Sequence, residues 1–150
     1  MDPLLRQAAR LIIVDPEYSV LLFQYEDDQR RWWATPGGGL EGGETFEEAA
    51  AREAEEELSL TGGILTPLWS RTVEFTFRGQ PIRQVERYFL MRISRVDLAV
   101  AEAVREAHRR EGIVAARWWS LAELETKSEQ VFPEDLSECL RGLRKLHTLP

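Results

Sequence analysis

A glycine-rich segment that leads directly into an acidic helix constrains this sequence most strongly. The segment reads TPGGGLEGGE over residues 35–44 and continues as TFEEAAAREAEEEL over residues 45–58. Thr45 is a suitable N-cap and Glu48 completes a capping box, so we expect a helix from about Thr45 to about Ser59. The glycines favour a loop whose backbone amides and carbonyls stay accessible to a metal or a phosphate. The chain must therefore place a ligand-accessible loop immediately before a helix.

The negative charge of the chain is concentrated in this loop and helix. Eight of the 26 acidic residues and one of the 19 basic residues lie between Glu41 and Glu57. The rest of the sequence has 18 residues of each sign, so the formal net charge of −7 belongs to this stretch. Glu53 and Glu57 lie one helical turn apart, where like charges cost roughly 0.2–0.5 kcal/mol. The cluster therefore predicts a cation that the sequence itself does not encode.

A helical wheel places the side chains of Glu53, Glu56 and Glu57 within a sector of about 100°. The neighbouring sector is apolar, with Ala50, Ala51, Ala54 and Leu58. We therefore expect one face of the helix to pack on a sheet and three carboxylates to converge at the edge of that face. Ligation by oxygen alone suits Mg²⁺ or Mn²⁺, whereas zinc prefers nitrogen and sulfur. A metal, a phosphate-binding loop and a carboxylate base are the parts needed for attack of water on phosphorus.

Length and composition limit the class of protein. With 150 residues, 43% of them hydrophobic, residues 1–150 are expected to form one domain. The longest aliphatic run covers only residues 11–14, and no cationic segment precedes it, so we expect neither a membrane span nor a secretory signal. The single cysteine, Cys139, fits a reducing cytoplasm. A pI near 5.0 argues against binding to a nucleic-acid polymer.

The remaining pattern mixes strands with helices. The expected strands cover residues 6–14, 19–25, 64–77, 82–93 and 113–119, with hairpin turns at residues 15–18 and at Gly79-Gln80. The expected helices cover residues 121–125 and a final segment that opens at Pro133, with Leu136, Leu140 and Leu143 on one stripe. Residues 98–110 fit either a short helix or an ordered loop. The expected fold class is α+β, with a mixed β-sheet and helices that cover it.

From Gly38 to Leu60 the sequence resembles the box of the Nudix hydrolase family, G-x5-E-x7-R-E-U-x-E-E-x-G-U, in which U is an aliphatic residue. Its fixed positions are matched by Gly38, Glu44, Arg52, Glu53, Glu56 and Glu57. The segments WWATPGGG and ARWWSLAEL are also similar to family segments. The resemblance implies a MutT-like protein with the family's α/β/α sandwich and a mixed sheet.

The sequence departs from the box at two positions. Ala54 is smaller than the usual aliphatic residue, and Ser59 replaces a glycine. A left-handed backbone would cost serine roughly 1–2 kcal/mol. Gly62, in the pair Gly62-Gly63, could end the helix instead, so we expect Ser59 to be a tolerated change at the helix end.

The resemblance also implies roles for individual residues. Glu53, Glu56 and Glu57 would bind Mg²⁺ or Mn²⁺ together with the main-chain carbonyl of Gly37. One of these glutamates would act as the catalytic base, and Glu53 is the first choice.

Other positions of the box would be architectural, because Arg52 would tie Glu44 to the loop around Gly38. The family often adds a carboxylate from the loop before the late strand. Glu111 is the expected catalytic residue of that loop, with Glu102 and Glu106 as rivals.

Four further residues are candidates for substrate binding, namely Trp32, Trp33, Arg83 and Arg87. Adjacent residues of a strand point to opposite sides, so one tryptophan is expected in the core and the other could stack on a base. The two arginines share a strand face, where they either contact phosphates or form a solvated, salt-bridged surface.

The implied reaction is hydrolysis of a nucleoside diphosphate linked to a group X. ADP-ribose hydrolases carry a proline about fifteen residues after the box, whereas Pro67 and Pro81 lie at +7 and +21 from Leu60. Diadenosine polyphosphate hydrolases tend to carry a tyrosine at about +17, where this chain has Phe77. The favoured substrate is therefore a (deoxy)nucleoside triphosphate, which would give a nucleotide and pyrophosphate.

Two alternatives stay open. One is a nucleotide-sugar or dinucleoside polyphosphate hydrolase, and the other, of a different class, is a Nudix-like module that binds nucleotides without hydrolysing them. The expected partner is a small nucleotide, with no membrane contact, and a homodimer is compatible with the sequence.

Overall fold

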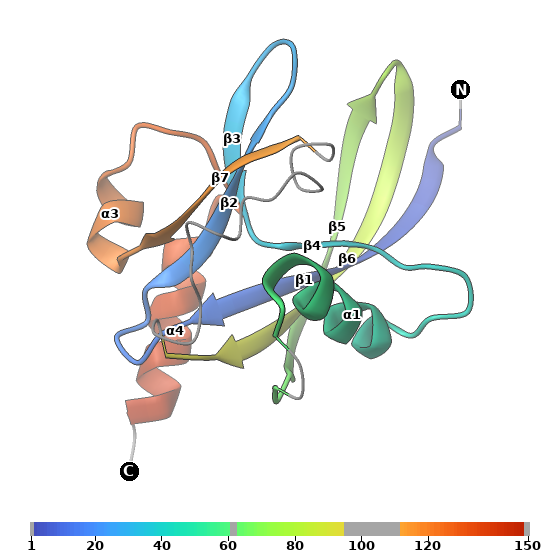
Figure 1. Ribbon diagram of the computed structural model, residues 1–150. Coiled ribbons are helices and arrows are strands. Elements are labelled where there is room, and N and C mark those ends of the chain that lie inside the picture. Colours follow the sequence, from blue (N-terminus) through green and yellow to red (C-terminus); the bar gives the residue numbers. More distant parts are fainter. Residues whose placement is uncertain (1, 61–62, 95–111, 149–150) are drawn as a thin grey trace. The chain divides into compact units, whose positions relative to one another are not determined.

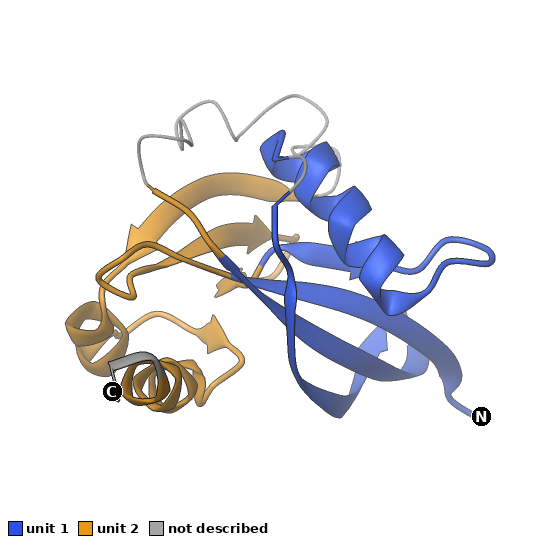
Figure 2. Ribbon diagram, turned by 90° about the horizontal axis from the view of Figure 1, so that it is seen from below, with its two compact units in different colours: residues 1–12, 36–91 blue, residues 13–35, 92–150 orange. Residues whose placement is uncertain are grey.

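The computed structural model describes residues 2–60, 63–94 and 112–148. The chain divides into two compact units, each made of two chain segments (Figure 2). Unit 1 comprises residues 1–12 and 36–91, and unit 2 comprises residues 13–35 and 92–150. The strand β1, Leu4–Val14, begins in unit 1 and ends in unit 2.

Unit 1 contains a long antiparallel hairpin, formed by β5 (Thr66–Phe77) and β6 (Gln80–Arg92), and β6 lies next to β1 (Figure 1). The turn between them has φ values of 51° at Arg78 and 78° at Gly79. Two successive positive φ values match the right-handed twist of a hairpin. The expected hairpin is confirmed, with its turn one residue earlier than predicted.

A short strand brings the glycine-rich loop to β1. Strand β4, Gly37–Gly39, pairs antiparallel with β1, and Ala8, Ala9 and Arg10 lie opposite Gly39, Gly38 and Gly37. The first part of the loop is thereby fixed to the sheet of unit 1, directly before the helix begins.

Helix α1 (Phe46–Leu58) follows that loop and lies over strands of unit 1 (Figure 2). The predicted capping box is confirmed, because the Thr45 hydroxyl accepts from the Glu48 amide at 3.1 Å and the Glu48 carboxylate accepts from the Thr45 amide at 3.0 Å. The other end lies close to the predicted bound, because the helix ends at Leu58 and Ser59 is its C-cap. Ser59 adopts the left-handed conformation with φ 57°, so the expectation that Gly62-Gly63 would end the helix instead is wrong.

Unit 2 is organised around β2 (Val20–Glu26), which follows β1 through the predicted turn and pairs antiparallel with β3 (Arg31–Ala34) and β7 (Ile113–Trp119). A two-residue strand, β8 (Val131–Phe132), pairs parallel with β3. Parallel and antiparallel pairs therefore occur together, as expected for a mixed sheet.

Two helices complete the described part of unit 2, α3 (Leu121–Thr126) and α4 (Leu136–Thr148). Helix α4 begins three residues after Pro133, and the predicted stripe of leucines is buried. The α+β class is confirmed. The segment 98–110 lies outside the described residues. No helix in the described ranges is long and apolar enough to cross a membrane.

Candidate metal and active site

Two glycines bring the backbone of β4 into close contact with its neighbours. A Cβ atom on Gly37, which has φ 140°, would lie 2.2 Å from the carbonyl oxygen of Ala9. A Cβ atom on Gly38 would lie 2.6 Å from Oε1 of Glu53. Gly37 is required by the sheet, and Gly38 leaves room for the carboxylate of Glu53.

Two of the predicted metal ligands lie in the packed face of α1. The exposed fractions of Glu53 and Glu57 are 7% and 6%, and the helix also buries Phe46, Ala49, Ala50, Ala54 and Leu58. Glu56, by contrast, is exposed. We expected the glutamates to form a separate sector beside the apolar one, but Glu53 and Glu57 belong to the buried face itself, whereas Ala51 is exposed. Burial of carboxylates is costly unless paired groups or a metal compensate.

Arg52 connects the helix to the loop that precedes it. Its Nε and Nη2 atoms donate to the two carboxylate oxygens of Glu44 at 2.7 and 3.0 Å, and Nη2 also donates to the Gly39 carbonyl at 3.0 Å. The backbone amide of Glu41 donates to Glu44 at 2.7 Å. Arg52 therefore contacts the loop at Gly39, and Glu44 contacts it at Glu41, so the two side chains together hold the loop in place.

This contact changes the ionisation of both groups. The Arg52 guanidinium holds the pKa of the Glu44 carboxyl below its usual value, with help from the Glu41 amide. The Glu44 carboxylate in turn raises the pKa of Arg52, against the effect of burial. Both groups stay charged across the physiological range, so the pair can hold the loop throughout.

The same arginine also contacts the predicted ligands. Its Nη1 atom lies 3.0 Å from Oε1 of Glu53 and 3.1 Å from Oε2 of Glu56. Within residues 2–60, 63–94 and 112–148, no three His, Cys, Asp or Glu side chains come together as a metal site would require. The expected convergence of Glu53, Glu56 and Glu57 is therefore not seen in this part of the chain, because two of these carboxylates turn toward Arg52.

The donor chemistry nevertheless fits a hard divalent cation. Glu53 and Glu57 supply buried carboxylate oxygens one turn apart on α1, and no nitrogen or sulfur ligand accompanies them in the box. The space beside Gly38, which a Cβ would fill, lets the backbone approach the Glu53 carboxylate. Glu53 and Glu56 contact Arg52 in this structure, so both would have to turn away from it to bind such a cation.

The two candidate tryptophans belong to unit 2 and lie on β3. Trp33 is buried, makes an edge contact with Trp119 and donates through its indole N–H to Glu129 at 2.6 Å. Trp32 is half-buried, stacks on Tyr25 and carries the guanidinium of Arg30 over its ring at 4.7 Å. The structure thus places one tryptophan in the core and the other near the surface.

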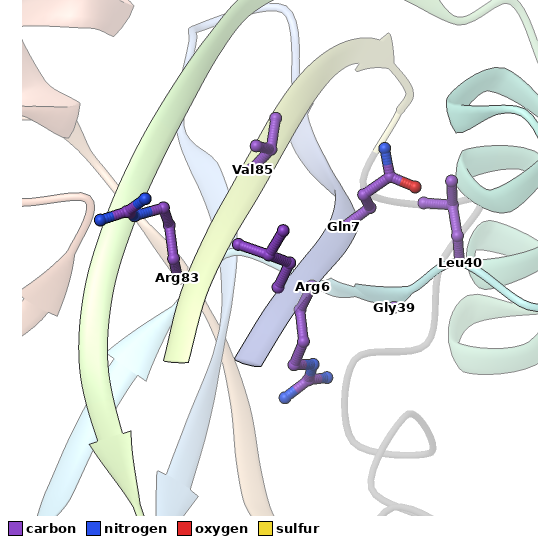
Figure 3. Close-up of a pocket in the computed structure, with 7 residues that line it drawn as sticks. Arg6, Gln7, Gly39, Leu40, Arg83 and Val85 are labelled. Atoms are coloured by element: carbon purple, nitrogen blue, oxygen red, sulfur yellow. The ribbon is translucent and has the colours of Figure 1, made fainter. Parts of the chain in front are cut away.

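The two candidate arginines belong to unit 1 and lie on β6. Arg83 donates to Glu74 at 2.8 Å, and the Arg87 guanidinium lies 4.4 Å from the centre of the Phe46 ring. Arg83 also lines a cavity of about 570 Å³ together with Arg6, Gln7, Leu40 and Val85 (Figure 3). Both arginines therefore have protein partners, and substrate binding by either stays a prediction.

The predicted catalytic residue Glu111 and its rivals Glu102 and Glu106 lie outside the described residues. A polar cluster between β1 and β6 was not predicted from the sequence. Arg10 of β1 and Gln84, Glu86 and Tyr88 of β6 form a hydrogen-bonded group. Polar residues at every second position of β6 were the available signal, because side chains at that spacing share one face of a strand.

The comparisons with known proteins agree with this architecture. The family model of the NUDIX domain matches residues 4–138. Among solved structures, the MutT protein from Methanosarcina mazei Go1 is similar with a TM-score of 0.66 and 16% identity, covering 99% of both chains.

Two ligand-bound structures are similar as well. An Ap4A hydrolase binary complex from C. elegans has a TM-score of 0.64 and 21% identity over 95% of this chain and 97% of that chain. The NUDIX domain of Shewanella oneidensis NrtR, complexed with ADP ribose, has a TM-score of 0.66 and 16% identity over 99% of this chain and 90% of that chain. Among curated proteins the comparison finds no match. The extent of the family match, across both units, shows that this chain belongs to the Nudix family.

Proposed function

We propose that this protein is a Mg²⁺- or Mn²⁺-dependent pyrophosphohydrolase of nucleoside diphosphate derivatives, with a (deoxy)nucleoside triphosphate as its favoured substrate. The observation that carries the proposal is the burial of Glu53 and Glu57 in the packed face of α1. Two carboxylates one turn apart on a buried helical face repel each other, and Arg52 contacts Glu53. A divalent cation bound by both carboxylates would offset this repulsion.

Glu53, Glu56, Glu57 and the Gly37 carbonyl would hold the cation. When bound, it would polarise a phosphoryl oxygen and offset the charge of the polyphosphate. Residues of the chain would supply the other parts of the reaction. Glu53, which lies against the Gly38 backbone, would accept a proton from the attacking water. The new bond would join that water oxygen to phosphorus, and the bridging bond to the leaving pyrophosphate would break.

Arg52 and Glu44 would act by holding the glycine-rich loop in position. Their double contact fixes the loop to α1, which holds the Gly37-Gly38 backbone beside the helix. Glu111 is the proposed additional catalytic residue. Trp32 is the more suitable of the two tryptophans for stacking on a base, because it is half-buried and Trp33 is enclosed. We place this small-molecule reaction in the cytoplasm, on the basis of the single cysteine.

The substrate class is tested by a panel of (d)NTPs, oxidised dGTP, ADP-ribose and dinucleoside polyphosphates, each assayed with Mg²⁺ and with Mn²⁺. The triphosphate proposal predicts the highest kcat/KM for a (d)NTP, with pyrophosphate as the product. A preference of about tenfold or more for ADP-ribose, equal to about 1.4 kcal/mol, would contradict the triphosphate assignment while leaving the hydrolase assignment standing.

A second candidate has one observation in its favour. Arg52 engages both Glu53 and Glu56, which would suit a module that binds nucleotides without hydrolysing them. Such a module would bind a nucleotide in the panel without turning it over, and its affinity would be unchanged in the Glu56→Gln variant.

A further inference from the structure

We propose that Arg10, held in place by Glu86, is a positioning residue that orients the carbonyl of Gly37. The inference rests on the proposed function, because it gives that carbonyl a role as a cation ligand. The Arg10 guanidinium would fix the direction of the carbonyl before the cation arrives.

The register of the sheet brings Arg10 to this place. Arg10 on β1 lies directly opposite Gly37 on β4. Its Nη1 atom donates to the Gly37 carbonyl at 3.4 Å, and its Nε atom donates to Oε2 of Glu86 at 3.2 Å. One planar guanidinium therefore bridges the glycine-rich strand and the neighbouring strand β6.

Glu86 is itself fixed by further hydrogen bonds. Its Oε2 atom also accepts from the Gln84 side chain at 2.8 Å, and its Oε1 atom accepts from the Tyr88 hydroxyl at 3.1 Å. Gln84, Glu86 and Tyr88 are all buried, with exposed fractions of 3%, 7% and 4%. A carboxylate with three donors has little freedom to rotate, so it holds the arginine in one orientation.

The energetic cost of this arrangement argues for a positional role. A buried ion pair pays a desolvation penalty that its attraction often fails to recover, and apolar residues of similar volume commonly stabilise a fold as well or better. The pair is only partly buried, with 22% of the Arg10 side chain and 10% of the Glu86 side chain exposed, so stability alone is a weak reason for its place on a sheet face. A network that orients a ligand of a functional site gives a stronger one.

The pairing of β4 with β1 already fixes the chain at Gly37, and the preceding carbonyl, that of Pro36, accepts from the Leu11 amide at 2.8 Å. The Arg10 contact adds a side-chain donor at the Gly37 carbonyl itself. A carbonyl oxygen has two lone pairs, so it can accept from Arg10 and still face a cation.

The test measures binding of Mn²⁺ alone to the full chain, by calorimetry or by electron paramagnetic resonance, without substrate. Arg10→Met removes the donors, and Arg10→Lys keeps the charge but loses the planar fork. Arg31→Met is the matched control, because it removes an arginine from a different ion pair, the one with Glu26, and leaves the contact with Gly37 in place. The melting temperature of each metal-free variant is recorded alongside.

We expect Arg10→Met and Arg10→Lys to raise the Kd for Mn²⁺ by about tenfold, the usual effect of losing an outer support of a ligand. Arg31→Met should leave the Kd within about twofold of the wild type, because it removes the same charge while the support at Gly37 is intact.

Three results would overturn the inference. Equal Kd values in the wild type and both Arg10 variants would show that the arginine only stabilises the fold. Tighter binding by Arg10→Met alone would show that its charge merely repels the cation. If the wild type itself bound no Mn²⁺, the proposed function would fail first and the inference would fall with it.

Discussion

Arg52 and Glu44 form a two-pronged ion pair, with Nε to Oε2 at 2.7 Å and Nη2 to Oε1 at 3.0 Å. The pair joins the last residue of the loop to the middle of α1, eight residues further along the chain. Because the same guanidinium reaches the Gly39 carbonyl and the carboxylate of Glu53, it connects the architecture of the loop to the candidate site.

Replacing Arg52 should therefore cost both stability and function. Arg52→Met leaves Glu44 and the Gly39 carbonyl without this donor, and we expect a loss of about 2–4 kcal/mol in the free energy of unfolding. Arg52→Lys should recover only part of the loss, because an ammonium group cannot make the double contact. Urea denaturation measures the free energy of unfolding of both variants. Equal stability of the Lys variant and the wild type would argue against a role for the fork geometry.

The acid limb of the stability profile should depend on Glu44. Its pKa is lower in the folded protein than its usual value of 4.5, because Arg52 and the Glu41 amide favour the charged form. The stabilisation is therefore fully present above pH 4.5 and is lost as the pH falls through the lowered pKa. In thermal melts from pH 7 to pH 3, Glu44→Gln should show a shallower decline than the wild type. Glu55→Gln, a matched change at an exposed position of α1, should decline as the wild type does.

Replacing Ser59 with glycine should stabilise the fold. Its left-handed backbone, with φ 57°, is strained for serine and accessible to glycine, although glycine adds entropy to the unfolded chain. We expect Ser59→Gly to raise the free energy of unfolding by about 0.5–1 kcal/mol. Ser59→Ala keeps the strained conformation and should give no gain. If Ser59→Gly were no more stable than Ser59→Ala, the proposal that the left-handed backbone is strained at Ser59 would be wrong.

Substitution of Gly38 should lower turnover, because Gly38 lies against the carboxylate of Glu53. In Gly38→Ala the new Cβ would meet Oε1 of Glu53 at 2.6 Å, so the carboxylate must move while the backbone can stay. We expect turnover to fall by about tenfold or more, with a small change in melting temperature. Gly42→Ala, where a Cβ meets nothing within 4 Å, is the control and should keep full turnover. Full turnover by Gly38→Ala would show that the position of Glu53 is not critical.

The sequence predicted the parts of this protein that depend on local signals. The capping box at Thr45 and Glu48 and the long β5–β6 hairpin follow from propensity and from residue spacing along the chain. The left-handed backbone of Ser59 was not predicted, because serine disfavours that conformation and the chain departs here from the glycine of the Nudix box.

The candidate site was predictable in its residues and less so in its geometry. The Nudix box identifies the glutamates, but the rotamers that turn Glu53 and Glu56 toward Arg52 depend on side-chain packing. The Arg10–Glu86 contact joins residues 76 positions apart, so only the pairing of β1 with β6 reveals it.

The central claim is that the buried glutamates of α1 support metal-dependent hydrolysis, and the most direct measurement is the rate of nucleotide hydrolysis by three proteins. Wild type, Glu57→Gln and Glu55→Gln are assayed on the best substrate of the panel, with Mg²⁺ and with excess chelator. We expect wild type and Glu55→Gln to turn over at similar rates with metal and to stop with chelator. Glu57→Gln should be slower by about 100-fold or more, although it is folded. Full activity of Glu57→Gln, or activity of the wild type that persists with chelator, would contradict the account.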